Sequence, residues 1–346
     1  MLPKTILVVN KTNIRYLSGF SGTAGALTMR GKRGWLFTDA RYHLVAKKVL
    51  PAGFGLIDVT AGFEKPWMAF LKKYRVRRLG VEGGTITLRS WKQFKKMSAG
   101  VKFIDIKDTL DQKRVVKKPL ELNYINKAQK ITDVIFCVLK KWLKPGVSEK
   151  SIAWKIESLA HDFGADDISF PPIIGINEHS ASPHHQNTDR KLKRGDLILI
   201  DMGVIFRGYC SDMTRVLFTN TPTAEQSAIY QLVLKAQETA IKKLKAGITG
   251  KQADQWARSV IEKAGYGKNF GHSLGHGVGL DIHELPNLSQ KYSGKIPAGS
   301  VVTVEPGVYL LGKFGVRLED MVVVGKSGVR NITKSPKAIQ KCVIRI

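Results

Sequence analysis

Two strand-turn-strand segments, each carrying a pair of acidic residues, constrain this chain more than any other feature. The first, DLILIDMGVIFRGYCSDMTRVLF, joins two apolar runs at Arg207-Gly208. A hairpin that turns near residue 207 places residues opposite each other when their numbers sum to about 413, as those of Asp201 and Asp212 do. The Cβ atoms of this pair are then expected about 5 Å apart.

The second segment, VVTVEPGVYLLGKFGVRLEDMVVV, turns at Gly312 and places Glu305 opposite Glu319 by the same construction. Each acid alone has a structural interpretation: Asp201 could cap a turn, and Glu319 could pair with Arg317 or a lysine. Four carboxylates in a buried sheet, however, repel one another and lose their hydration. The doubled arrangement therefore favours bound cations.

The segment GHSLGHGVGLDIHELP supplies a candidate nitrogen ligand. His276 lies between Gly275 and Gly277, which let the backbone and a metal ion approach closely, so we predict His276 as the fifth ligand. His283, seven residues later, and His184, in SPHHQNTDRKL, stay available to hydrogen-bond a substrate.

Four carboxylates with one imidazole suit Mn²⁺, Co²⁺ or Fe²⁺, and also Zn²⁺. We expect two divalent ions, with Mn²⁺ or Co²⁺ ahead of Fe²⁺ or Zn²⁺, because two ions could hold a bridging hydroxide and polarise a carbonyl for hydrolysis. Glu305 would carry protons from water to a leaving nitrogen, and His184 and His283 would stabilise the intermediate or position the substrate. The predicted metal ligands are Asp201, Asp212, His276, Glu305 and Glu319.

The order of strand-like and helical runs predicts two domains, as the length of 346 residues already suggests. Strands are expected at 4–10 and 34–38 and in LIDVT, RRLGVEGG and VKFIDI, with helices at 40–49, 64–74 and 88–98. The charged stretch DQKRVVKKP reads as a linker. We predict an α/β domain over 1–113, a linker over 114–119 and a second domain over 120–346.

The second domain is predicted to pack helices on a largely antiparallel sheet. Apolar residues recur at helical spacing over 120–143, Ser148 is a plausible N-cap of a helix that ends before Gly164, and further helical patterns occupy 223–245 and 250–264. Apolar strands are expected at 196–206, 209–219, 300–311 and 314–325. The whole chain is therefore assigned to the α+β class.

Composition excludes several other classes of protein. Cys137, Cys210 and Cys342 are far apart and form no CxxC pair, which argues against a disulfide framework and for a reducing cytoplasm. The sequence shows neither a signal peptide nor the roughly 20 apolar residues of a membrane span. The net charge is +28, and residues 1–118 hold 25 Lys and Arg against 7 Asp and Glu. Such a surface attracts polyanions without specificity, but no aromatic pattern indicates specific nucleic-acid binding.

The motifs PHHQNTDRKLKRGDLILIDMG, GYCSDMTR, HSLGHGVGLDIHE, TVEPGVY and GVRLED resemble, in order and spacing, those of the creatinase/methionine-aminopeptidase-like "pita-bread" metallopeptidases. The resemblance is closest to Xaa-Pro dipeptidases and Xaa-Pro aminopeptidases. NIRYLSGFSGTAGAL and LFTDARY resemble the creatinase-type N-terminal domain, so the likeness covers nearly the whole chain.

The resemblance implies the same five ligands, roles for His184 and His283, cleavage of the bond before proline in short peptides, and a homodimer. One departure matters: many such dipeptidases carry an arginine after HExP that can hold the substrate carboxylate, whereas this chain has Asn287. A longer peptide cut by an aminopeptidase thereby becomes more plausible. The alternatives are a non-catalytic pita-bread scaffold, against which the complete ligand set argues, and a basic nucleic-acid-binding protein.

Overall fold

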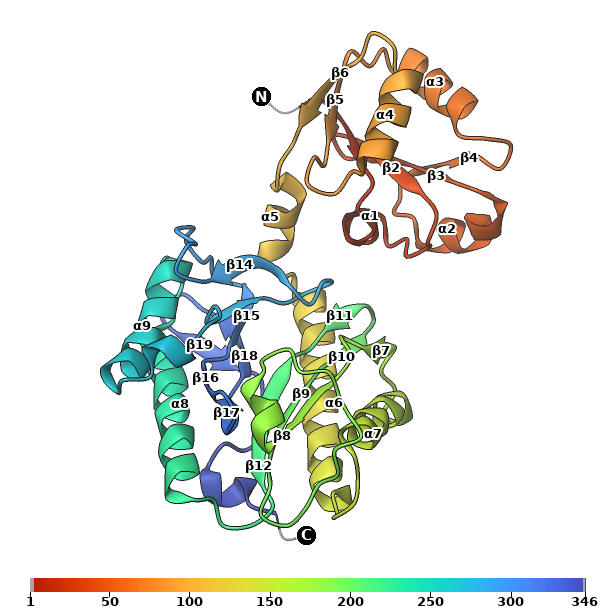
Figure 1. Cartoon of the computed structure of the whole chain (residues 1–346). Helices are drawn as coiled ribbons and strands as arrows, with labels where there is room; N and C mark the ends of the chain where they lie inside the picture. The colour runs from red at the N-terminus through yellow and green to blue at the C-terminus, as the bar shows by residue number, and fades with distance from the viewer. Residues whose placement is uncertain (1–2, 345) are drawn as a thin grey trace. The chain divides into compact units, whose positions relative to one another are not determined.

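The computed structural model describes residues 3–344 and 346, and the chain divides into two compact units, Met1–Arg114 and Val115–Ile346. Figure 1 shows that each unit packs helices against strands. Over the described residues, every helix is too short or too polar to cross a membrane. In the segment predicted as a linker, helix α5 (Thr109–Val115) ends and helix α6 (Pro119–Trp142) begins, so only residues 116–118 lie between helices. Lys and Arg are good helix formers and Pro is accepted at the first helical position, so the composition of this segment does not exclude helix.

The Met1–Arg114 unit is built on one mixed sheet with the strand order β4-β3-β2-β1-β5-β6. All of its strands except β2 run in the same direction. The strands are β1 (Thr5–Val8), β2 (Ala26–Arg30), β3 (Arg33–Thr38), β4 (Gly55–Asp58), β5 (Arg78–Val81) and β6 (Lys102–Asp105). Beside α5, the helices of this unit are α1 (Lys11–Ser18), α2 (His43–Val49), α3 (Glu64–Lys73) and α4 (Leu88–Met97), with a 3₁₀ turn at Ala40–Tyr42.

Helices cover both faces of this sheet. Trp67 and Phe70 of α3 and Phe94 of α4 fill one face, whereas Ile14 of α1 and Ala46 of α2 belong to the core of the other face. The helix α1 and the strand β2 were not predicted from the sequence. The helix α1 is held at its start by the Asn10 side chain, which accepts hydrogen bonds from two backbone amides.

The Val115–Ile346 unit confirms the expected helices over an antiparallel sheet, since all of its paired strands are antiparallel. Its other helices are α7 (Glu149–Asp162), α8 (Ala224–Lys243) and α9 (Gly250–Lys263), with 3₁₀ turns at Asn177–Ala181, Gly267–Asn269 and Ile339–Cys342. The strands are β7 (Asp167–Ile168), β8 (Ile173–Ile176), β9 (Leu197–Met202), β10 (Val204–Phe206), β11 (Tyr209–Cys210), β12 (Met213–Phe218), β13 (Gly275–Gly277), β14 (Glu284–Leu288), β15 (Val301–Val304), β16 (Gly307–Leu310), β17 (Phe314–Arg317), β18 (Asp320–Val324) and β19 (Val329–Asn331).

Local signals explain where the long helices begin and end. Ser148 accepts a hydrogen bond from the Ser151 amide at the start of α7, and Gly164 takes a left-handed φ of 79° just beyond its end. Thr223 and Thr249 cap α8 and α9, and in each case the side-chain oxygen of a glutamine three residues later accepts a hydrogen bond from the amide of the cap residue. The strands β9 and β12 are fully buried, because α6 to α9 contribute one large core with them.

The predicted register of the first hairpin is wrong by two residues. Asp201 lies opposite Thr214 in the β9–β12 pair, not opposite Asp212. The turn falls between Arg207 and Gly208, both with left-handed φ values of 52° and 81°, as a two-residue hairpin turn requires. Side chains alternate with a period of two, so the offset keeps both acids on the same face.

The predicted register of the second hairpin is correct. Val304 pairs with Asp320 in β15–β18, and Gly307 pairs with Arg317 in β16–β17. Glu305 and Glu319 lie between these paired stretches and therefore face each other. The turn itself passes through Gly312, which has a φ of 74°.

Candidate metal centre

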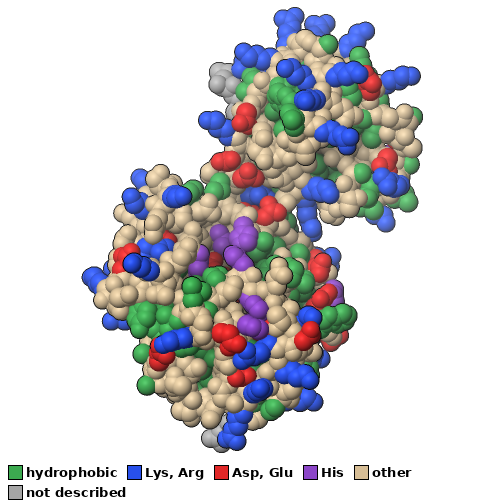
Figure 2. Space-filling view, in the orientation of Figure 1, with side chains coloured by type: hydrophobic (Ala, Val, Ile, Leu, Met, Phe, Trp, Pro, Cys, Tyr) green, Lys and Arg blue, Asp and Glu red, His purple; other side chains and the backbone are tan. Residues whose placement is uncertain are grey.

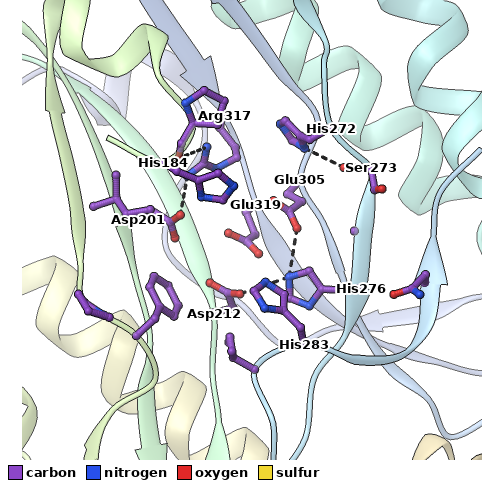
Figure 3. Close-up of a pocket in the computed structure, with 17 residues that line it drawn as sticks. His184, Asp201, Asp212, His272, Ser273, His276, His283, Glu305, Arg317 and Glu319 are labelled. Carbon is purple, nitrogen blue, oxygen red and sulfur yellow. Dashed lines mark hydrogen bonds and ion pairs between the residues drawn. The ribbon is translucent and has the colours of Figure 1, made fainter. Parts of the chain in front are cut away.

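The five predicted ligands converge around one cavity of about 560 Å³ (Figure 3). They come from five places in the fold: β9, the residue before β12, β13, the residue after β15, and the residue before β18. Asp201, Asp212, His276, Glu305 and Glu319 all line the cavity. The structure thus brings together all five residues that the sequence singled out.

His276 lies between two of the carboxylates. Its Nε2 atom is 3.3 Å from Glu305 Oε1 and 3.7 Å from Asp212 Oδ2. Its Nδ1 atom lies 3.1 Å from the Gly277 carbonyl oxygen, which can only accept, so Nδ1 carries the proton. Such a second hydrogen bond orients the ring so that Nε2 faces the two carboxylates, where a metal ion would replace its contact with Glu305.

Arg317 forms an ion pair with Asp201, with 2.5 Å between Nη2 and Oδ2. The sequence-based alternative that Arg317 neutralises Glu319 is therefore wrong. Glu319 instead accepts a hydrogen bond from Thr214 Oγ1 at 2.7 Å, and Arg317 Nε donates to the same Thr214 oxygen at 3.0 Å. The structure pairs one of the four carboxylates with a fixed cation and leaves the other three to other partners.

Burial and mutual repulsion perturb the pKa values of these acids. Burial and the Asp201 charge raise the pKa of Asp212 well above its usual range, and burial with the charge of Asp212 does the same for Glu319. Burial also raises the pKa of Asp201, although Arg317 opposes the rise. Without a bound cation, the ionised forms of Asp212 and Glu319 are thus strongly disfavoured.

Glu305 and His276 show the opposite pattern. Burial opposes both charges and is the largest single effect, but the hydrogen bond and the charge attraction between the two side chains, with smaller contributions from other neighbours, together outweigh it, lowering the pKa of Glu305 to about 2 and raising that of His276 to about 9. Glu305 is therefore an anion at neutral pH.

The donor set fits divalent cations. Asp201 Oδ1 and Glu319 Oε1 are buried without a hydrogen-bond partner, which is costly for carboxylate oxygens unless a cation contacts them. Asp212, His276 and Glu319 offer ligand atoms that all lie within 4.8 Å of one another. Carboxylate oxygens with one imidazole are ligands that Mn²⁺ and similar ions accept.

His184 and His283, which the sequence assigned to substrate contacts, also line the cavity. The His283 ring lies edge-on to His276, with 4.3 Å between the ring centroids. Burial and the nearby His276 lower the pKa of His283, so this side chain is neutral at neutral pH. The remaining wall is largely apolar and includes Phe170, Pro171, Ile173, Pro183 and Ile282.

Three further residues of the centre were not predicted as functional. Arg317 also donates to the Tyr309 hydroxyl at 2.8 Å, and this hydroxyl lies 2.8 Å from His272 Nε2. A chain of contacts thus runs from His272 through Tyr309 and Arg317 to Asp201. Arg317 precedes Glu319 by two residues, and this spacing on a strand could have placed it on the same face.

A second group that could hold a metal ion consists of Glu149, His179 and His185. The fully buried Glu149 carboxylate already accepts hydrogen bonds from the Ile176 amide, the Thr188 amide and hydroxyl, His179 and His185, at 2.8 to 3.0 Å. Both of its oxygens are therefore satisfied, which favours a hydrogen-bonded anchor over a metal site. This anchor fixes the loop that carries His184.

The fold and the buried cluster define a class of protein, the pita-bread metallopeptidases. A match to Metallopeptidase family M24 covers residues 123–326, and a match to the Creatinase/Prolidase N-terminal domain covers residues 4–116. The chain belongs to metallopeptidase family M24 and carries a creatinase-type N-terminal domain. It is a hydrolase that acts on peptides.

Individual relatives agree with this assignment. An uncharacterized peptidase, YqhT, of Bacillus subtilis is 35% identical over 334 residues, which cover 96% of this chain and 94% of the relative. The solved Xaa-Pro dipeptidase from Bacillus anthracis is 35% identical with a TM-score of 0.95, covering 99% of this chain and 95% of that one. The X-Pro aminopeptidase from Thermotoga maritima is 33% identical with a TM-score of 0.92, covering 99% and 98%.

Proposed function

We propose that this metallopeptidase hydrolyses the peptide bond before proline, with two divalent ions held by Asp201, Asp212, His276, Glu305 and Glu319. The observation that carries the metal assignment is the pair of buried carboxylate oxygens, on Asp201 and Glu319, that make no hydrogen bond within the cluster. Mn²⁺ or Co²⁺ is the first choice of ion, ahead of Fe²⁺ or Zn²⁺. Similarity to an Xaa-Pro dipeptidase and an X-Pro aminopeptidase supports the proline preference.

The chain's own residues suit amide hydrolysis. Bound divalent ions would supply Lewis acidity toward the scissile carbonyl and lower the pKa of an attacking water. Glu305, ionised at neutral pH, would accept the proton of that water and deliver it to the leaving nitrogen. His283, neutral at that pH, and His184 would donate hydrogen bonds to the substrate carbonyl oxygen as negative charge develops there. The apolar wall beside these groups suits a proline ring.

The charged side chains that line the cavity support a preference for longer peptides, as expected of an aminopeptidase. Among the described residues that line it, Arg317 is the sole Lys or Arg, and its guanidinium is engaged by Asp201. Asn287, also in the lining, offers a neutral amide. A free carboxylate directly after proline therefore meets no unpaired lysine or arginine of the lining, and we expect Xaa-Pro-Yaa peptides to be cut faster than Xaa-Pro dipeptides.

The test is Mn²⁺- or Co²⁺-dependent release of the first residue from Xaa-Pro-Yaa peptides, compared with hydrolysis of Xaa-Pro dipeptides under the same ion. Peptides with alanine in place of proline are the substrate control. Asp212→Asn is expected to abolish the activity and leave the circular dichroism spectrum unchanged. Full activity in this variant would contradict the metal assignment, and equal cleavage of the alanine peptides would contradict the proline preference.

The domain boundaries, a homodimeric state and a cytoplasmic location stay predictions. We propose that the domains predicted over 1–113 and 120–346 correspond to the units Met1–Arg114 and Val115–Ile346. Light scattering of the purified chain would test the dimer.

A further inference from the structure

The Met1–Arg114 unit separates its charges between the two edges of its sheet. The unit holds 23 Lys and Arg against 7 Asp and Glu. All seven acids lie at or beyond the carboxyl ends of the strands; Asp58 ends β4, Glu82 follows β5 and Asp105 ends β6. Figure 2 shows Lys and Arg side chains spread over this unit, with Asp and Glu far sparser.

The opposite edge is purely cationic. The segment from the last turn of α3 to the start of β5 carries Lys72, Lys73, Arg75, Arg77 and Arg78, and all five are exposed. The segment from the last turn of α4 to the start of β6 adds the exposed Lys95, Lys96 and Lys102. We call these eight side chains the basic edge.

The fold brings these two connections together. The strands β5 and β6 are parallel neighbours, and Arg78 lies directly beside Lys102 in their register. The Lys102 amide also donates to the Arg77 carbonyl at 2.9 Å. Within the described chain none of the eight forms an ion pair with a carboxylate. Lys4, before β1, and the exposed Lys32 and Arg33, at the β2–β3 turn, extend the same edge.

Helix capping explains only part of this arrangement. Lys72 and Lys73 lie in the last turn of α3, and Lys95 and Lys96 in the last turn of α4, where the helix dipole favours cations. Arg77, Arg78 and Lys102 lie outside the helices, and like charges side by side on paired strands destabilise the sheet. A polyanion would remove this repulsion.

We propose that the basic edge binds the phosphate backbone of double-stranded nucleic acid, independently of base sequence and apart from the peptidase centre. Its eight cations can replace condensed counterions, which is the main source of non-specific duplex affinity. Stacking on unpaired bases is not expected, because the basic edge has no exposed aromatic residue among those that the structure describes. The half-buried Tyr74 ring already lies against Arg30 and Lys73.

Other occupants fit less well. The large exposed apolar residues of this unit, such as Leu44, Met68 and Leu88, all lie outside the basic edge, so nothing there would insert into a bilayer. A second copy of the chain offers only a weak acidic complement, because the opposite edge of this unit holds just seven acids, of which Glu82 is buried, and Val115–Ile346 holds 33 Lys and Arg against 21 Asp and Glu.

The test measures fluorescence anisotropy of a labelled random-sequence DNA duplex with the full chain over a KCl titration. The basic-edge variant carries Arg77→Gln, Arg78→Gln, Lys96→Gln and Lys102→Gln. The matched control carries Lys11→Gln, Lys65→Gln, Arg89→Gln and Lys92→Gln, which remove the same charge from exposed positions in the first turns of α1 and α3 and the first half of α4.

We expect the basic-edge variant to flatten the slope of log Kd against log [KCl] by about 3 to 4 and to weaken binding at least about tenfold, with a much smaller effect in the control. If the quadruple variant does not fold, Arg78→Gln/Lys102→Gln should flatten the slope by about 2. Equal losses in both quadruple variants, no duplex binding by the natural chain at low salt, or binding to phosphatidylserine vesicles without duplex binding would each overturn the proposal.

Discussion

Metal binding should stabilise the Val115–Ile346 unit, because its buried carboxylates ionise at a cost in the metal-free chain. Burial and the charge of Asp201 raise the pKa of Asp212, so ionising this carboxyl costs more free energy in the folded chain than in the unfolded chain, which exposes it to water. A cation present at 100 times its Kd, and bound only by the folded state, adds about 2.7 kcal/mol. In a domain of this size each kcal/mol moves Tm by about 2–4 °C, so Mn²⁺ should raise Tm by about 5–11 °C.

The assay is thermal unfolding at pH 8, first with chelator and then with Mn²⁺ in excess. Asp212→Asn removes both a ligand and a repelling charge, so in chelator this variant should melt at or above the natural chain. Mn²⁺ should raise the Tm of this variant by less than half as much as it raises that of the natural chain. Asp254→Asn is the matched control: Asp254 is a buried acid outside the five ligands, 2.7 Å from Arg258 Nε. The Asp254→Asn variant should have a lower Tm than the natural chain both with and without Mn²⁺, and Mn²⁺ should raise its Tm by the same amount.

The reasoning fails on a specific result. If Asp212→Asn melts below the natural chain by the same amount in chelator and in Mn²⁺, the Asp212 carboxylate is stabilised by the protein alone. An absent Mn²⁺ effect in the natural chain would lead to the same conclusion.

The other predictions concern the surroundings of the centre. Arg317→Ala leaves the buried Asp201 carboxylate unpaired and should cost about 3–5 kcal/mol in urea unfolding, with partial recovery in Arg317→Lys. His184→Ala should lower kcat about 10²- to 10³-fold and leave the Mn²⁺-dependent rise in Tm intact. Glu149→Gln loosens the His184 loop and should lower kcat roughly 10- to 100-fold at constant metal affinity, measured by Mn²⁺ titration. The raised pKa of His276 stabilises the metal-free fold below about pH 6.5, and this stability should disappear as the pH rises through about 9, which urea unfolding in chelator can follow.

The two hairpins show what strand arithmetic can and cannot predict. The second hairpin turns at Gly312, the residue type that a left-handed φ favours, and its register follows directly from that position. The first places Arg207, a non-glycine, at a φ of 52°, so the turn centre lies one position later than the sequence indicated. The candidate ligands survive this error because a shift of two residues changes the partner of Asp201 but not the face of the strand.

The contact between the two hairpins had to be predicted from a different argument, because the strand pairing within one hairpin does not show where the other hairpin packs. Repulsion among four carboxylates favoured a shared cation site, and the structure provides the contact: the Glu319 amide donates to the Thr214 carbonyl at 3.1 Å. Arg317 was missed as a partner of Asp201 because 116 positions separate them and only the packing of the two hairpins brings them together. Its charge changes the net charge of the centre: four carboxylates and one guanidinium carry three net negative charges, so the two proposed divalent ions would leave one net positive charge. A centre with that charge attracts the oxygen of a substrate carbonyl, which is the polarity that amide hydrolysis needs.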